Sequence, residues 1–183
     1  MKTTIQSSLR GAAFLLATSL AATLTAQTTD TTTAGATTTV TTATKLGHHD
    51  HVFFKKAAEC GAKKIAVSQA VMNNLTNAQV RDFANTMVSD HTAVANELTN
   101  LAIAKGVTLP PADTAKLTEK WSKKDGNVDK KYLHEMIEDH EDTVKLFEKA
   151  SKSDDADIAA FAQRTLPTLQ HHLQMAKDLK KTL

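Results

Sequence analysis

Apolar residues recur every three or four positions from Asp50 to the end of this 183-residue chain. This spacing is typical of α-helices that bury one face and expose the other. Only three glycines interrupt the segment, at Gly61, Gly106 and Gly126. Helices with a single apolar stripe need partners to bury it, so the pattern predicts an all-α bundle over residues 50–183.

Start and stop signals divide this segment into four long helices and a short one. The short helix is expected between the second and third long helices, from a cap at Asp113 to Lys124. Asp50 is expected to cap the first long helix, and Thr76 the second through a capping box. Gly106 suits the position just after the second. The long helices are expected at about residues 51–75, 76–105, 129–151 and 154–181.

Three of the apolar stripes carry a histidine where an apolar residue is expected. His91, His140 and His172 occupy these positions on the second, third and fourth long helices. With a rise of about 1.5 Å per residue, their heights along the bundle differ by about 9 Å, whichever way the third long helix runs. The sequence therefore predicts that the three rings can meet in the interior.

Two interpretations of these histidines stay open. Neutral imidazoles are common ligands of zinc, copper, nickel and iron, which predicts a site for one divalent transition metal. Asp90 and Glu138 lie beside them in sequence and are candidate ligands or hydrogen-bond acceptors. In the alternative, the rings form a buried polar cluster that is hydrogen-bonded within the protein. Three further carboxylates are near enough in sequence to be metal ligands or hydrogen-bond acceptors: Glu97, Asp139 and Glu141.

The N-terminal 26 residues have the pattern of a signal peptide. Lys2 and Arg10 precede the apolar run 11–24, and Ala26 suits a cleavage position. About 14 residues is short of the roughly 20 that a membrane-spanning helix needs, although an N-terminal anchor is the alternative. We therefore expect an exported protein of the periplasm, or one that is secreted or associated with the envelope.

A threonine-rich segment follows the predicted signal peptide. Eleven of the 18 residues in 27–44 are threonine, and no apolar alternation gives the segment a face to bury. We predict a disordered linker over residues 27–49. O-glycosylation or attachment to the cell wall is the functional alternative.

Composition excludes several classes of partner and site. Loss of Lys2 and Arg10 with the signal peptide leaves 20 basic residues against 20 acidic ones, so no charge argument for nucleic acid remains. The single cysteine, Cys60, excludes a disulfide framework and a cysteine-based zinc site. No nucleophile motif or phosphate-binding loop appears, so no reaction is predicted and any protein partner is undefined.

Four blocks of the sequence carry a resemblance to a known family. They are Asp50–Ala58, Val80–His91, Tyr132–His140 and Phe161–Leu173. In this arrangement the chain resembles the bacterial family called domain of unknown function 4142. The resemblance implies an exported, ferritin-like antiparallel four-helix bundle with a long connection between the second and third helices. It also implies that His91, His140 and His172 are the family's histidines.

One departure from the family bears on the metal. The family often has Glu-Val in the first helix, where this chain has Lys64-Ile65. Ferritin-type di-iron sites use carboxylates together with Glu-x-x-His on two helices. Here the residues three positions before the histidines are Val88, Ile137 and Leu169. A di-iron centre is therefore not expected, and Lys64 would oppose any cation nearby.

Overall fold

The computed structural model describes residues 45–183, which form α-helices and contain no strand. The all-α fold class is thus confirmed for this part of the chain, and none of its helices is long and apolar enough to cross a bilayer. The predicted signal peptide and residues 27–44 of the predicted linker lie outside the described residues. The elements are α1 (His48–Val71), a 3-10 turn η1 (Met72–Asn74), α2 (Ala78–Ala104), α3 (Ala115–Ser122), α4 (Val128–Ala150) and α5 (Ala156–Lys181).

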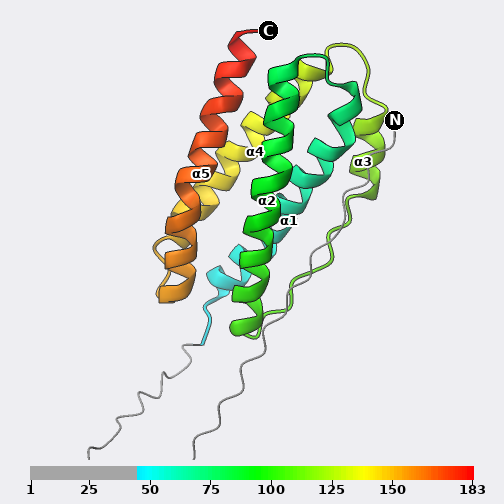
Figure 1. Ribbon diagram of the computed structural model, residues 1–183. Helices are drawn as coiled ribbons and strands as arrows, with labels where there is room; N and C mark the ends of the chain where they lie inside the picture. Colours follow the sequence, from blue (N-terminus) through cyan, green and yellow to red (C-terminus); the bar gives the residue numbers. More distant parts are fainter. Residues whose placement is uncertain (1–44) are drawn as a thin grey trace, which may run out of the picture. The chain divides into compact units, whose positions relative to one another are not determined.

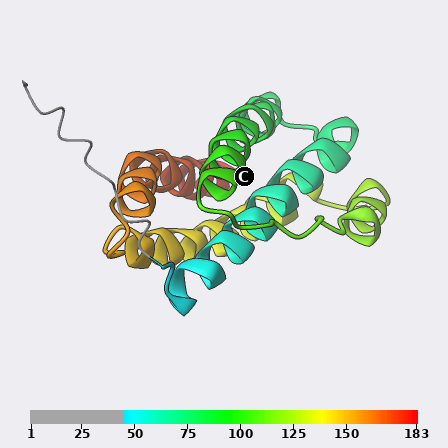
Figure 2. The ribbon, with the colours of Figure 1, turned by 90° about the horizontal axis from the view of Figure 1, so that it is seen from below.

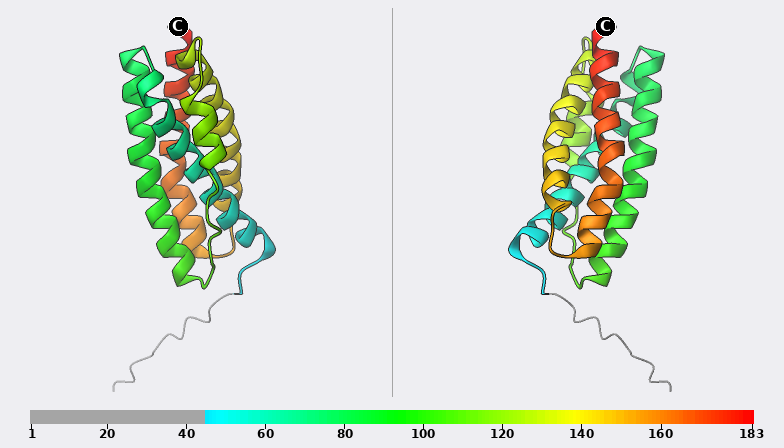
Figure 3. Two further views of the ribbon diagram at one scale, coloured as in Figure 1. Left: turned by 90° about the vertical axis from the view of Figure 1, so that its right-hand side faces the viewer. Right: turned by 90° about the vertical axis from the view of Figure 1, so that its left-hand side faces the viewer.

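Contacts at the helix ends establish the directions of the four long helices. At one end, Lys105 after α2 pairs with Asp155 before α5 at 2.6 Å. At the other end, the Thr76 hydroxyl before α2 donates to Asp129 in the first turn of α4. Hence α1 and α5 run one way and α2 and α4 the other, as Figure 1 shows. The connection 105–127 returns the chain along the length of the domain (Figure 3).

Each long helix has two long neighbours. α1 packs against α2 and α4, and α5 packs against the same two helices from the other side (Figure 2). The short helix α3 lies against α1. Its Trp121 is buried and meets the ring of Tyr132 edge-on, with 6.5 Å between ring centroids. Trp121 therefore anchors the long connection to the core.

The predicted cap of the first helix was wrong. α1 begins at His48 after Gly47, three residues earlier than expected. Asp50 lies in the first turn, where its carboxylate accepts a hydrogen bond from the Gly47 N–H at 3.2 Å. A carboxylate near a helix N-terminus is favourable in either position, so sequence alone did not distinguish them.

The caps of α2 and α3 also differ from expectation. The Asn77 side chain, rather than Thr76, caps α2 by accepting from the N–H of Gln79 at 2.8 Å. Thr76 is instead engaged by Asp129, a partner from another helix. α3 begins after Thr114, one residue beyond the expected cap, and ends at Ser122, but the Asp113 carboxylate still accepts from the N–H of Ala115 at 3.4 Å.

The core consists of two apolar clusters separated by a polar layer. The layer takes one buried ionisable side chain from each long helix, and its members are Lys64, His91, His140 and His172. On one side lies a cluster that includes Val71, Phe83, Met87, Tyr132, Leu133 and Met136. On the other lies a cluster that includes Phe53, Phe54, Leu98, Phe147, Ile158 and Phe161.

Candidate metal centre

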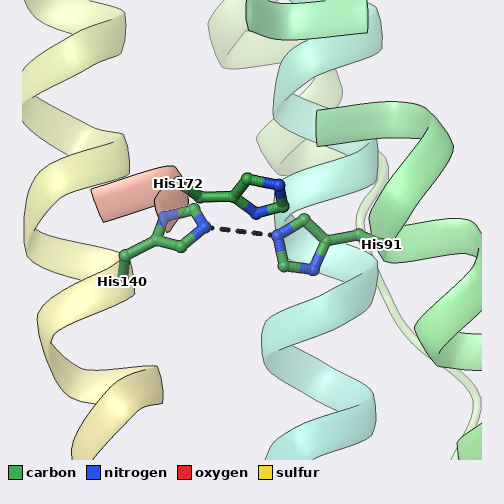
Figure 4. Close-up of side chains that lie close together, drawn as sticks. All are labelled: His91, His140 and His172. Atoms are coloured by element: carbon green, nitrogen blue, oxygen red, sulfur yellow. Dashed lines mark hydrogen bonds between the residues drawn. The ribbon is translucent and has the colours of Figure 1, made fainter. Parts of the chain in front are cut away.

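The three stripe histidines meet in the interior, as the sequence predicted. One ring nitrogen from each of His91, His140 and His172 lies within 4.8 Å of the other two. The ring centroids are 5.3 to 5.6 Å apart, and Figure 4 shows the rings turned toward a common centre. Their exposed fractions are 3%, 0% and 1%. Three buried histidines therefore lie close enough together to bind one metal ion.

A backbone carbonyl orients the ring of His140. Its Nδ1 lies 2.7 Å from the carbonyl oxygen of Met136, one turn earlier on α4, so Nδ1 carries the proton and donates it there. The Nε2 atom is left with a free lone pair and lies 3.3 Å from Nε2 of His91. Two imidazole nitrogens bound to one tetrahedral ion at about 2.0–2.1 Å would lie about 3.3 Å apart. This pair is already spaced as two metal ligands would be.

Asp90 orients the ring of His172. The His172 Nε2–H donates to the Asp90 carboxylate at 2.9 Å, which leaves Nδ1 as the acceptor nitrogen. This Nδ1 is buried and has no hydrogen-bond partner among the described residues. In Figure 4 it faces the other two rings. An unpartnered buried acceptor costs stability, so its presence needs an explanation.

All three histidines are held in the neutral form. Burial lowers the pKa of His91 to about 2 and that of His140 to about 3, and the charge of Lys64 acts in the same direction. The pKa of His172 is also lowered by burial, although the bond to Asp90 opposes the shift. Neutral rings are the form that binds metals. At neutral pH, metal uptake would therefore displace no proton from them.

Lys64 is the fourth member of the polar layer and was only partly anticipated. Its side chain is 1% exposed, and its ammonium donates to Thr143 Oγ1 at 2.8 Å. Burial lowers its pKa. The sequence indicated a lysine near the site but gave no signal for Thr143 as its partner, because that contact joins α1 to α4.

The predicted carboxylates divide into one that reaches the site and four that do not. Asp90 hydrogen-bonds to His172 and acts as an acceptor rather than a ligand. Glu138 does not fit the predicted ligand role, since it is 64% exposed and lies beside His134. It stands two residues before His140, which turns it away from the buried face of α4. Of the other three, Asp139 pairs with Lys63, Glu141 pairs with Lys177, and Glu97 is exposed.

The sequence matches the family described as domain of unknown function DUF4142 over residues 35–179. The chain belongs to this family. The match spans the whole polar layer, which confirms the family indicated by the sequence blocks. A comparison with curated proteins gives no match.

Two solved structures share the helical fold. A DUF305 fragment from Deinococcus radiodurans superposes with a TM-score of 0.66 at 10% identity, covering 75% of this chain and 98% of that one. A conserved hypothetical protein from Mycobacterium tuberculosis gives a TM-score of 0.59 at 16% identity, covering 75% of this chain and 99% of the other. At these identities the likeness concerns the fold alone.

Proposed function

We propose that this protein binds a single divalent transition-metal ion through His91, His140 and His172. The observation that carries the proposal is the unpartnered Nδ1 of His172, buried and facing two further imidazoles. In a cluster built only for hydrogen bonding, that acceptor would be expected to have a donor. A metal ion would satisfy all three nitrogens at once.

The donor set favours one ion of borderline softness: zinc, copper, nickel or iron(II). The carboxylate of Asp90 would then accept a hydrogen bond from the His172 ring nitrogen that does not bind the metal. Metal-bound histidines commonly donate such a bond to a carboxylate, which fixes the orientation of the ring. Among the described residues, Asp90 is the only carboxylate hydrogen-bonded to any of the three rings, and it bonds to His172 alone, so the bridging carboxylates of a di-iron pair have no counterpart among these contacts.

A second candidate is an envelope scaffold or stress protein in which the histidines form a structural polar cluster. The contact that favours it is the 3.3 Å approach of the two Nε2 atoms, which is also a hydrogen bond if His91 carries its proton on Nε2. In that case the cluster would define how the four helices align, at some cost in stability.

The proposed setting is the periplasm, with secretion or attachment to the envelope as the alternative. It is supported by the basic start, the short apolar run and the small residues before position 27. We also propose that the helical domain is a ferritin-like bundle. The single long connection between the second and third long helices supports this, because ferritin-like folds have one such connection.

Elemental analysis of the untagged protein tests the metal proposal. We expect one zinc, copper, nickel or iron ion per chain after purification or after titration with each metal. The double variant His91→Ala/His140→Ala should bind none, because only one of the three ring nitrogens remains.

Matched controls come from exposed histidines on the same helices. His134→Ala on α4 and His171→Ala on α5 each remove an imidazole from the surface and should keep the full metal content. Metal-free wild-type protein, with the double substitution merely lowering the unfolding temperature, would favour the structural cluster instead.

A further inference from the structure

The ammonium of Lys64 is incompletely neutralised inside the core. An ammonium has three N–H donors. Among the described residues it has two acceptors, Thr143 Oγ1 at 2.8 Å and the Asp139 carbonyl at 3.4 Å. The charge of the Asp139 carboxylate acts to raise the pKa of Lys64, but the carboxylate forms no hydrogen bond to this ammonium, and its Oδ1 pairs with Lys63 at 2.7 Å. One donor of Lys64 is thus left over in the polar layer.

The position of Thr143 brings this charge next to the candidate metal centre. Thr143 stands three residues after His140, so the two side chains share the buried face of α4. Its hydroxyl donates to the Asp139 carbonyl at 2.6 Å, which leaves the oxygen lone pairs for Lys64. The ammonium therefore contacts a residue that lies about one helical turn after His140, and its charge acts to lower the pKa of all three histidines.

The charges at this site do not balance when a divalent cation binds. The ion and Lys64 together would carry three positive charges, and Asp90, the carboxylate hydrogen-bonded to His172, carries one negative charge. Repulsion between buried charges is weakly screened and costs several times what it would in water. Three imidazoles also leave the fourth position of a tetrahedral ion open.

We propose that the site binds its metal ion together with a small monovalent anion, and that Lys64 is the residue that selects for the anion. The inference rests on the proposed metal-binding function and specifies its ligand. The anion would occupy the open coordination position on the ion. It would also accept a hydrogen bond from the remaining N–H of the Lys64 ammonium. Lys64 thus acts as a specificity-determining residue rather than as a ligand.

Cobalt(II) binding to the full-length chain tests this, with visible absorption as the readout because the bands of four-coordinate cobalt respond to the fourth ligand. Cobalt is titrated at constant ionic strength, first in perchlorate, which coordinates weakly, and then with chloride, azide or thiocyanate replacing it. For wild-type protein we expect each coordinating anion to tighten cobalt binding by about tenfold or more and to change the spectrum.

Removal of the Lys64 charge should remove the need for a coordinating anion. Lys64→Met keeps the length of the side chain without its charge and should bind cobalt in perchlorate about tenfold more tightly than wild type or better. Its dependence on the added anion should fall correspondingly. Lys64→Gln is a second variant that retains a donor for Thr143. Lys56→Met, at an exposed lysine two turns earlier on α1, is the matched control and should behave as wild type. Circular dichroism melts establish that each variant is folded.

The outcomes separate the two proposals. If wild-type protein binds cobalt equally tightly with and without a coordinating anion, the proposed role of Lys64 is wrong. This measurement needs no variant. The role is equally overturned if both Lys64 variants bind no more tightly than wild type, or if they lose the metal, which would make Lys64 a ligand. If wild type and every variant fail to bind cobalt, the metal-binding function itself is wrong.

Discussion

The apolar clusters and the polar layer between them are equally buried but are held together by different forces. Phe54, Leu133 and Ile158 in the clusters are 0% exposed, and so is His140 in the layer. The clusters are stabilised by the removal of apolar surface from water, which depends on volume and tolerates many residue types. The layer depends on a few directed contacts, some within one helix and others between helices, such as Lys64 with Thr143 and His172 with Asp90.

This contrast indicates what the layer is for. Burial of Lys64 and three imidazoles costs desolvation energy that an apolar layer would avoid. Stability alone therefore does not explain these residues. Two of the three rings are oriented by an acceptor, His140 by the Met136 carbonyl and His172 by Asp90, which is an arrangement that suits a binding site.

Mild acidification should have the largest effect on stability, because it protonates groups of the polar layer and leaves the apolar clusters unchanged. The folded-state pKa values of His91 and His140 are lowered to about 2 and about 3, whereas the unfolded chain binds protons near pH 6.5. The unfolded state then holds more protons, so stability is complete above pH 6.5 and falls as the pH drops toward 3. Between pH 6.5 and 4.5 we expect a loss of about 2 kcal/mol for each histidine that stays neutral. Urea unfolding at the two pH values, in the presence of a chelator, measures this loss of unfolding free energy.

The chosen pH window is dominated by the histidines. Asp129, Asp155 and Asp178 also have lowered pKa values, but their contribution is lost only near and below their ordinary value of 3.8. Glu141, whose pKa is lowered from 4.5 by Lys177, begins to contribute only at the lower end of the window. Equal unfolding free energies at pH 6.5 and 4.5 would show that the rings are not held neutral.

Truncation in an apolar cluster should have the next largest effect. Leu133→Ala leaves a cavity in the cluster that contains Phe83 and Met136 and should lower the free energy of unfolding by about 3 kcal/mol. The metal content should be unchanged at temperatures where the variant is folded. Ile103→Ala is the control, since Ile103 is 71% exposed, and should change stability by less than about 0.5 kcal/mol. A similar loss in both variants would contradict the assigned core.

Replacement of the paired rings by apolar side chains should have the smallest effect and the opposite sign. His91→Leu/His140→Leu removes both members of the Nε2 contact, so neither is left without its partner. We expect an unfolding free energy at pH 7 that is higher by about 1–3 kcal/mol. The double variant should also lose metal binding and most of the acid dependence. A loss of stability instead would mean that the ring contact is structural.

Much of the fold was predictable because each helix is determined by residues that are close together in the sequence. The three- and four-residue spacing located all four long helices to within a few residues, and also assigned His91, His140 and His172 to buried faces. The capping errors have a tertiary cause at Thr76, which bonds to Asp129 from a distant helix. The outward position of Glu138 could have been inferred from helical periodicity, since it lies two residues from a buried ring.

The chemistry around the rings was less predictable. Asp90 was a candidate from its place beside His91, yet the ring that it orients belongs to α5. Thr143 carried no signal at all, because its significance comes from an ammonium on α1. Contacts of this kind depend on which helices are neighbours and at what height, and no local pattern encodes either.

The sequence by itself determined the helices, their buried faces and the one histidine on each of three faces, because rotation about a helix axis repeats every few residues. Only the tertiary structure decided that α4 runs parallel to α2, that the three rings share one level, and that Lys64 completes the layer. The physical reason is the connection 105–127, which returns along the whole domain before α4 begins. The heights at which distant side chains meet follow from that path and from packing of the assembled core.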